Sequence, residues 1–363
     1  MEIVKVGILL EDRAFAQALS IALSREDSCM RFYLLDSAAE GESCDLILAE
    51  RPSSDEKVIE LVRDSEAVRY TGDPPYKLYR YMESQNLINS LLFIYFKVTG
   101  KVIETKGDTS CKLVVFLGES GGCGTTSAAL ATACMLHRIY GSKSLYLNLC
   151  PIDDSRKYFS EEGEESLMKL LYYLDQEKEF PIGAFITERE ELDFVNTGII
   201  NSYFNEMKPF LMRRFLHKID QLGKYDFLIV DMGNHLSREN RKMLSYADCA
   251  VMLCDSQRVR PGKYRQRIAR EIFKRVEAGR LLRVENFAGD MPCSQEMEIE
   301  AETLVISTQQ DVDLRLEKNY GMEIGILARE IMEGGVHGDG KCCIPRGEDG
   351  KGAGADSCGK GKS

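Results

Sequence analysis

Apolar residues in the first hundred positions come in short runs separated by amphipathic stretches. Short apolar runs bounded by polar residues predict buried strands, and apolar positions three or four apart predict helices. The stretch Leu78–Val98 predicts either a long helix or a strand that passes into one. The other predicted elements are strands at Val4–Leu10, Arg31–Leu35, Asp45–Ala49 and Ala67–Thr71, and helices at Ala14–Leu23 and Val58–Arg63.

A second segment of the same kind follows the polar, glycine-containing stretch Thr99–Ser110, which is the best linker candidate. Because strands alternate with helices, we expect an α/β chain with mostly parallel sheets, the second one doubly wound. The expected units are residues 1–105, residues 106–336 and a disordered tail, 337–363, rich in Gly and Lys. The predicted elements are strands at Lys112–Leu117, Ser144–Leu149, Asp226–Val230 and Ala250–Cys254, and helices at Thr125–Tyr140, Glu165–Asp175, Phe210–Gln221, Arg238–Leu244 and Lys263–Glu277.

Composition narrows the classes of function. The formal net charge is -11, which disfavours stable binding to nucleic acid or to anionic lipid. The 12 cysteines form no C-x-x-C pair, and the N-terminus lacks the apolar core of a signal peptide, so we expect a cytoplasmic protein. No apolar run reaches the roughly 20 residues that a membrane helix needs. We therefore expect no direct membrane insertion.

The stretch CKLVVFLGESGGCGTTSAALATA combines an apolar strand, a glycine-rich turn and an alanine-rich helix. Glycines 121, 122 and 124 let the backbone curl so that its N–H groups converge on an anion at the helix N-terminus. Thr126 would present a hydroxyl to a phosphate-bound Mg²⁺, and Thr125 and Ser127 would add donors. An ordinary tight turn between strand and helix is the alternative interpretation.

A second motif, KYDFLIVDMG at 224–233, is an apolar strand that ends in Asp231 and glycine. A carboxylate at that point can hold Mg²⁺ through water, opposite Thr126, as the second motif of P-loop proteins does. A buried strand that ends in a capping aspartate is the alternative. Together the two motifs favour nucleotide binding.

The loop GESGGCGTT resembles the deviant phosphate loop of the MinD/ParA superfamily, K-G-G-x-G-K-T. Ser120 stands at the signature lysine and Thr125 at the phosphate-loop lysine, while Glu119 replaces the first glycine of the general motif. Loss of both lysines is similar to the TadZ/CpaE branch, which the order of the later stretches 144–149, 165–174, 225–237 and 245–256 also favours. The resemblance implies a flavodoxin-like, receiver-like domain ahead of a P-loop NTPase domain.

The resemblance also implies roles for particular residues. The nucleotide-binding set is Ser120, Gly121, Gly122, Cys123, Gly124, Thr125, Thr126 and Ser127 in the loop, with Asn286 as the base-reading asparagine. Cys150 occupies the position of the aspartate that orients the attacking water, and Asp154 or its neighbour Asp153 could serve instead, although a solvated acidic turn is the simpler interpretation. Asp231 is the second expected catalytic residue. Without the lysines we expect weak or absent hydrolysis, unless Lys112, Arg156 or Lys157 substitutes.

Acidic residues after two predicted strands of the first unit match part of a receiver domain. Glu11 and Asp12 match the acid pair, Glu50 falls at the phosphoacceptor position, and Thr71 matches the switch hydroxyl. Because glutamate is one methylene longer than aspartate, Glu50 cannot support the same acyl-phosphate geometry. We expect a pseudo-receiver used for docking or dimerisation; the alternative is four polar residues at strand ends.

Three further features have simpler interpretations. The tail residues His337, Cys342, Cys343 and Cys358 lack the usual metal-ligand spacing. The amphipathic stretch 322–335 has one arginine against three glutamates, the wrong balance for a lipid surface. The basic run Arg258–Arg275 predicts a solvated helix face, with contact to a partner or to DNA as the alternative.

The function that the resemblance implies is a homodimer that binds ATP and Mg²⁺ and localises or assembles a Tad-type pilus or related secretion machine. Its partners would place it at the cell pole or the inner face of the membrane. The alternative is a partitioning or positioning ATPase of the ParA or MinD type. A receiver linked to an AAA+ domain would need a lysine loop and a helix-turn-helix end, and a bacterial tyrosine kinase would need tail tyrosines, none of which follows Tyr320.

Overall fold

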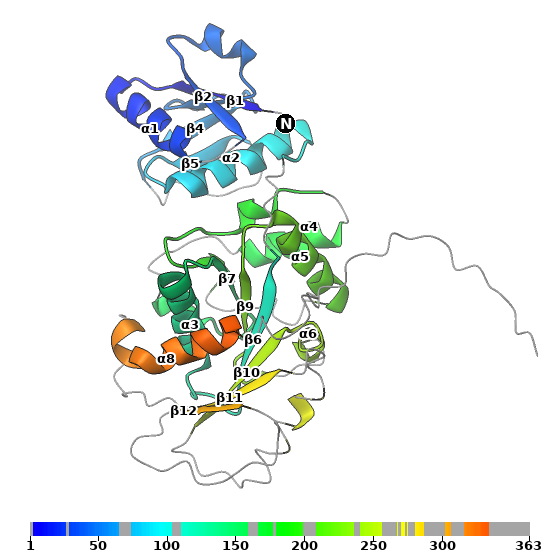
Figure 1. Cartoon of the computed structure of the whole chain (residues 1–363). Helices are drawn as coiled ribbons and strands as arrows, with labels where there is room; N and C mark the ends of the chain where they lie inside the picture. Colours follow the sequence, from blue (N-terminus) through cyan, green and yellow to red (C-terminus); the bar gives the residue numbers. More distant parts are fainter. Residues whose placement is uncertain are drawn as a thin grey trace, which may run out of the picture.

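The computed structural model describes two parallel sheets with helices around them (Figure 1). The described residues are 3–26, 29–64, 74–103, 110–158, 166–176, 179–198, 208–235, 240–255, 267, 270–272, 274, 280–286, 302–305 and 316–333. The domain boundary expected at 105 and the tail from 337 lie outside them. Among the described residues, no helix is long and apolar enough to cross a membrane.

The first sheet has five strands in the order β2-β1-β3-β4-β5, and every neighbouring pair is parallel. Its central strands are buried on both faces, as a parallel sheet requires. Helix α1 begins at Arg13 because the side chain of Asp12 caps it, accepting from the Phe15 N–H at 3.0 Å. The elements are β1 Val4–Leu9, α1 Arg13–Arg25, β2 Met30–Leu34, η1 Ala38–Ser43, β3 Leu46–Ala49, β4 Val58–Val62, β5 Tyr76–Tyr79 and α2 Ser84–Thr99.

The structure corrects one prediction for this unit and decides between the two alternatives of another. The helix predicted at Val58–Arg63 is wrong, because the segment forms strand β4, with Ile59 and Leu61 buried and their neighbours half-buried. Its β-branched residues favour a strand, and β3 and β5 both pair with it. The stretch from Leu78 onward is a strand that passes into a helix. The strand predicted at Ala67–Thr71 lies outside the described residues.

The second sheet has seven parallel strands in the order β12-β11-β10-β6-β9-β7-β8. The chain starts in the middle at β6 and winds first toward β7 and later toward β10, so the strand order reverses at β6. Ligands of such sheets bind beyond the carboxyl ends of the strands at this reversal point. The elements are β6 Lys112–Gly118, α3 Thr125–Tyr140, β7 Ser144–Asn148, η3 Asp154–Lys157, α4 Ser166–Asp175, η4 Ile182–Phe185, β8 Asp193–Val195, α5 Pro209–Leu222, β9 Phe227–Asp231, α6 Asn240–Met243, β10 Cys249–Asp255, β11 Leu281–Asn286, β12 Glu302–Val305 and α8 Leu316–Glu333.

Both faces of the second sheet are covered (Figure 1). Helices α3 and α8 cover one face, where the small alanines of α3 bring the helix close to the strands and Ile324 and Leu327 of α8 are buried. Helices α4 and α5 cover the other face. The amphipathic stretch, as far as Glu333, therefore belongs to a core helix, and its apolar side is already occupied. Strands β8 and β12 were not predicted because they have only three and four residues.

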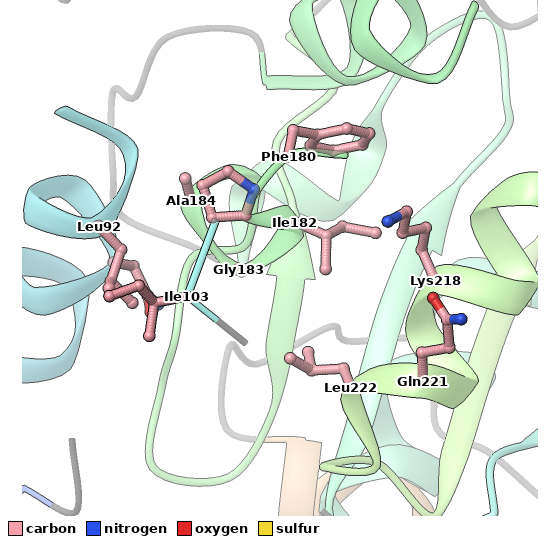
Figure 2. A pocket seen from close by; sticks show the side chains of 11 residues that line it. Leu92, Ile103, Phe180, Ile182, Gly183, Ala184, Lys218, Gln221 and Leu222 are labelled. Atoms are coloured by element: carbon pink, nitrogen blue, oxygen red, sulfur yellow. The ribbon is translucent and has the colours of Figure 1, made fainter. Parts of the chain in front are cut away.

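Helix α2 contributes to both cores. Leu87 and Leu91 lie in the core of the first sheet, whereas Phe93 lies in the core of the second, with its ring centroid 5.4 Å from that of Phe185. Asn89 donates to a carboxylate oxygen of Glu188 at 2.8 Å, across the junction. Figure 2 shows a small pocket at this junction, between α2, η4 and α5. The two units are thus joined by packed side chains and hydrogen bonds.

Candidate functional site

The glycine-rich loop leaves β6 at the reversal point and turns into α3. Gly122 and Gly124 have φ angles of 78° and 86°, a conformation that favours glycine, and Gly124 caps α3. A Cβ on Gly118 would lie 2.3 Å from the Cys123 sulfur and 2.6 Å from the Thr125 hydroxyl, so the loop folds back closely over the strand end. The N-terminal N–H groups of a 16-residue helix are thus held at the mouth of the sheet.

Three neighbouring strands hold the loop in place. The Gly118 N–H donates to the Gly233 carbonyl at 2.7 Å, and the Glu119 N–H donates to the Leu253 carbonyl at 2.9 Å. The Asn286 amide, buried at the end of β11, donates to the Cys123 carbonyl at 2.9 Å. The loop geometry therefore depends on residues far along the chain.

The hydroxyl of Ser120 is a buried polar group that a ligand at the loop could bind. The residue is 6% exposed, and its hydroxyl oxygen has no hydrogen-bond partner among the described residues. A buried hydroxyl left in this state costs roughly 1–3 kcal/mol, which a ligand oxygen at the loop would recover. The loop thus has a buried donor suited to an anionic ligand.

Thr126 and Asp231 meet at the start of α3. The Thr126 hydroxyl donates to Asp231 Oδ2 at 2.5 Å, and the Gly233 N–H donates to Oδ1 at 2.9 Å. Asp231 is 0% exposed, and a third donor, the Tyr146 hydroxyl, lies 3.0 Å from Oδ2. Burial raises the pKa of Asp231 above its ordinary value, and the hydrogen bonds act in the opposite direction.

A hydroxyl and a carboxylate side by side fit Mg²⁺, which prefers oxygen ligands and keeps several waters. The described residues contain no group of three or more His, Cys, Asp or Glu that could enclose a metal ion. An ion at Thr126 and Asp231 would therefore complete its coordination with phosphate oxygens and water, as in nucleotide sites. The two motifs predicted from the sequence thus meet at one point.

The suggestion that Lys112 could replace a lost lysine is wrong. Lys112 begins β6 and lies 6.0 Å from the Phe227 ring, at the opposite end of the strand from the loop. Gly118 lies six positions further along the strand, which is about 20 Å. Arg156 and Lys157 belong to η3, but their side chains are not described.

The segment after β7 is organised around Asp153. Its Oδ1 accepts from Asn148 Nδ2 at 2.7 Å and from the Ser155 N–H and hydroxyl, and its Oδ2 accepts from the Thr197 hydroxyl at 2.7 Å. These donors make Asp153 a buried cap of η3. Asp154 is exposed at the start of η3, and its catalytic role stays a prediction.

Two thiols lie beside the site. Burial raises the pKa of Cys123, and burial together with the carboxylates of Asp231 and Asp153 raises the pKa of Cys150 far above its ordinary value. Both are therefore neutral thiols at physiological pH. Cys150 lacks the charge that the aspartate expected at its position would carry.

Two other predicted nucleotide contacts have partners within the chain. The Ser127 hydroxyl lies 2.6 Å from the Tyr158 hydroxyl, and Asn286 holds the Cys123 carbonyl. Nucleotide contact by Ser127 and base reading by Asn286 stay predictions. Sequence reasoning missed Tyr146 and Asn148, although both fall on alternate positions of an otherwise leucine-rich strand, a sign of a shared polar face.

Two of the three acidic residues predicted for the receiver pocket, Glu11 and Glu50, are paired with arginines, whereas Asp12 caps α1. Arg51 forms an ion pair with Glu11 at 2.5 Å, and the buried Arg80 lies 3.6 Å from Glu50. Arg80 also stacks on Phe15, 3.9 Å from the ring centroid. Arg80 was not predicted, although a cation directly after a strand was a visible signal.

Several predicted features lie wholly or mostly outside the described residues. Thr71 and the tail residues His337, Cys342, Cys343 and Cys358 are among them. Of the basic run, only residues 267, 270–272 and 274 are described.

Comparison with known proteins gave only structural matches. No protein-family model and no curated protein matches the chain. The chain is similar to a ParA family ATPase from Chlorobium tepidum TLS, with 16% identity and a TM-score of 0.45 over 65% of this chain and 96% of that one. It is also similar to the MinC:MinD cell division protein complex of Aquifex aeolicus, with 14% identity and a TM-score of 0.46 over 61% of this chain and 96% of that one. A third match is the cobyrinic acid a,c-diamide synthase of Mycobacterium smegmatis with bound ADP and magnesium, with 13% identity and a TM-score of 0.46 over 61% of this chain and 94% of that one.

Proposed function

We propose that the second unit binds ATP with Mg²⁺ at the loop Gly118–Ser127 and acts as a nucleotide-dependent switch that hydrolyses ATP slowly. The observation that carries this proposal is the hydrogen bond between Thr126 and Asp231 below a glycine-rich loop. The pair lies where the strand order reverses, which is the place for ligands in such sheets.

Each part of the site has a role in this proposal. The backbone N–H groups of the loop and the start of α3 hold the phosphates, and the Ser120 hydroxyl donates to one of them. Thr126 and Asp231 hold the metal ion. When bound, Mg²⁺ supplies the positive charge that the two missing lysines would otherwise give.

Slow hydrolysis follows from what the loop lacks. Cationic contacts of the arginine-finger kind are worth about 10³–10⁵ in rate, and both lysine positions of the loop carry hydroxyl residues. The neutral Cys150 cannot accept a proton from the attacking water. Binding of nucleotide, more than its turnover, would therefore set the state of the protein.

The wider role that we propose is that of a MinD/ParA-type protein of the TadZ/CpaE kind, a homodimer that localises a Tad-type pilus or related secretion machine. Support comes from the loop that lacks both lysines and from the front sheet, whose order is that of flavodoxin-like receivers. The pairing of Glu50 with Arg80 supports a pseudo-receiver that docks or dimerises without phosphorylation. The alternative is a partitioning or positioning ATPase.

Calorimetric titration of the protein with ATP, in Mg²⁺ or in EDTA, tests the binding. We expect Mg²⁺-dependent binding that weakens about tenfold or more in Thr126→Ala, since a hydrogen bond to a charged group is lost. The control is Thr132→Ala in the same helix, where the hydroxyl donates only to the Ala128 carbonyl. Absence of binding at millimolar ATP, or equal affinities in both variants, would contradict the proposal.

Phosphate release by the purified protein tests the slow turnover. Thr125→Lys returns a cation to the loop, and we expect it to tighten ATP binding and to raise the hydrolysis rate. An unchanged rate would show that the lysine is not the limiting defect. ATP-dependent retention on DNA at physiological salt would instead favour the partitioning alternative.

A further inference from the structure

Tyr146 is a fully buried tyrosine whose hydroxyl lies in the candidate metal site. It donates to Asp231 Oδ2 at 3.0 Å, and its oxygen accepts from Asn148 Nδ2 at 3.3 Å. Buried tyrosine hydroxyls need partners, but most find a backbone carbonyl or water. Here the partner is the carboxylate that also receives Thr126.

The sheet register explains how the three residues meet. Asn148 pairs with Asp231 and Tyr146 with Ile229 across β7 and β9, so all three polar groups lie on the face below α3. Residues on alternate positions of a strand share a face. The alternate leucines of β7 point to the opposite core. The polar face of β7 is thus directed at the start of α3.

The hydrogen bonds within the protein limit how many acceptor positions the Asp231 carboxylate has left for a ligand. A carboxylate has about four acceptor positions. Thr126 and Tyr146 both donate to Oδ2, and Gly233 donates to Oδ1. Oδ2 is therefore saturated by the protein, and Asp231 keeps one position, on Oδ1, for anything that binds at the loop.

The same hydroxyl continues into the segment that follows β7. Asn148 Nδ2 also donates to Asp153 at 2.7 Å, and Asp153 caps η3 through Ser155 and accepts from Thr197. All of these side chains are buried. A continuous set of hydrogen bonds therefore leads from Asp231 through Tyr146 to η3.

We propose that Tyr146 is a positioning residue that fixes the orientation of Asp231 toward a metal-bound nucleotide and connects it to the Asn148–Asp153 cap. This inference rests on the proposed nucleotide function. Its consequence is specific: the hydroxyl matters for the metal-dependent part of binding and does not matter for the phosphate contacts of the loop backbone.

The test is Tyr146→Phe, which removes only the hydroxyl. Binding of ATP is measured by titration at increasing Mg²⁺ and again in EDTA. We expect the Mg²⁺ concentration for half-maximal binding to rise about tenfold, the size of one lost hydrogen bond to a charged group, while affinity in EDTA is unchanged.

Tyr225→Phe is the matched control. Tyr225 is also fully buried and donates to a buried carboxylate, Asp193, at 2.8 Å, but it precedes β9 and lies at the end of the sheet away from the loop. We expect it to lower the melting temperature to a similar extent and to leave the Mg²⁺ dependence unchanged. If Tyr146→Phe does not fold, Asn148→Ala, which keeps the tyrosine hydroxyl but removes its donor, should shift the Mg²⁺ dependence in the same direction by a smaller factor.

The outcomes separate the two proposals. If the wild-type protein binds no ATP in Mg²⁺, the proposed function itself fails. If it binds, and the folded variant keeps the wild-type Mg²⁺ dependence or loses affinity equally in Mg²⁺ and EDTA, the role of Tyr146 is overturned and the function stands.

Discussion

Replacement of Gly118 by alanine should disrupt the loop, whereas the same change at Gly121 should not. A Cβ at position 118 would lie 2.3 Å from the sulfur of Cys123 and 3.2 Å from the backbone carbonyl of Ser120. Carbon contacts are optimal at about 3.5–4.0 Å, so the loop would have to move by roughly 1 Å. At position 121 the nearest atom would be Asn234 Nδ2 at 3.6 Å, an ordinary contact.

Overpacking of this kind costs about 1–3 kcal/mol, which for a domain of this size lowers the melting temperature by about 2–12 °C. Thermal unfolding of Gly118→Ala and Gly121→Ala, followed by circular dichroism, measures the difference. We expect Gly121→Ala to melt with the wild type and Gly118→Ala to melt earlier and to bind ATP more weakly. Equal melting temperatures for the two variants would refute the close approach of the loop to the end of β6.

Three other predictions concern single side chains. Asn286→Ala leaves the Cys123 carbonyl without its amide donor, so we expect a loss of about 1–3 kcal/mol in urea unfolding and weaker ATP binding; unchanged values in both would contradict the holding role of Asn286. Burial raises the pKa of Cys134 to about 12, so only about one thiol in 10⁴ is ionised at pH 8, and alkylation followed by mass spectrometry should be slow in the folded protein, faster as the pH rises toward 12, and fast in urea. Alkylation of Cys134 at the same rate with and without urea would contradict the raised pKa of this buried thiol. Glu188→Gln keeps the shape but removes the charge at the domain junction, and should cost about 1–3 kcal/mol, while Glu190→Gln on the exposed surface should stay within about 0.5 kcal/mol; equal stabilities would disprove the junction role.

Much of the fold was predictable because strands buried on both faces leave long apolar runs in the sequence. The β6, β9 and β10 runs are of this kind, and each was predicted within two residues of its bounds. The strand at Val58–Val62 was wrongly predicted as a helix because five residues fit the helix period and the strand period equally well. Only the pairing with β3 and β5 decides between the two.

Only those residues of the candidate site that stand in short sequence motifs could be predicted from the sequence. Thr126 and Asp231 stand in motifs with a fixed chemical logic, and the structure brings them together. The hold of Asn286 on Cys123 spans 163 residues, and no periodicity reports such a contact. Tyr146 was not predicted because the interior of a buried strand is expected to be apolar, and a tyrosine there fits the core by its ring alone.

Helix α2 contributes side chains to both hydrophobic cores, and this affects how the protein unfolds. Phe93 is inserted among Phe185 and Tyr173 of the second unit, while Leu87 and Leu91 of the same helix close the core of the first. Neither unit can melt without exposing apolar surface of the other. Heating should therefore produce one shared transition in place of two. Occupancy of the distant loop would then protect the front sheet from protease as well.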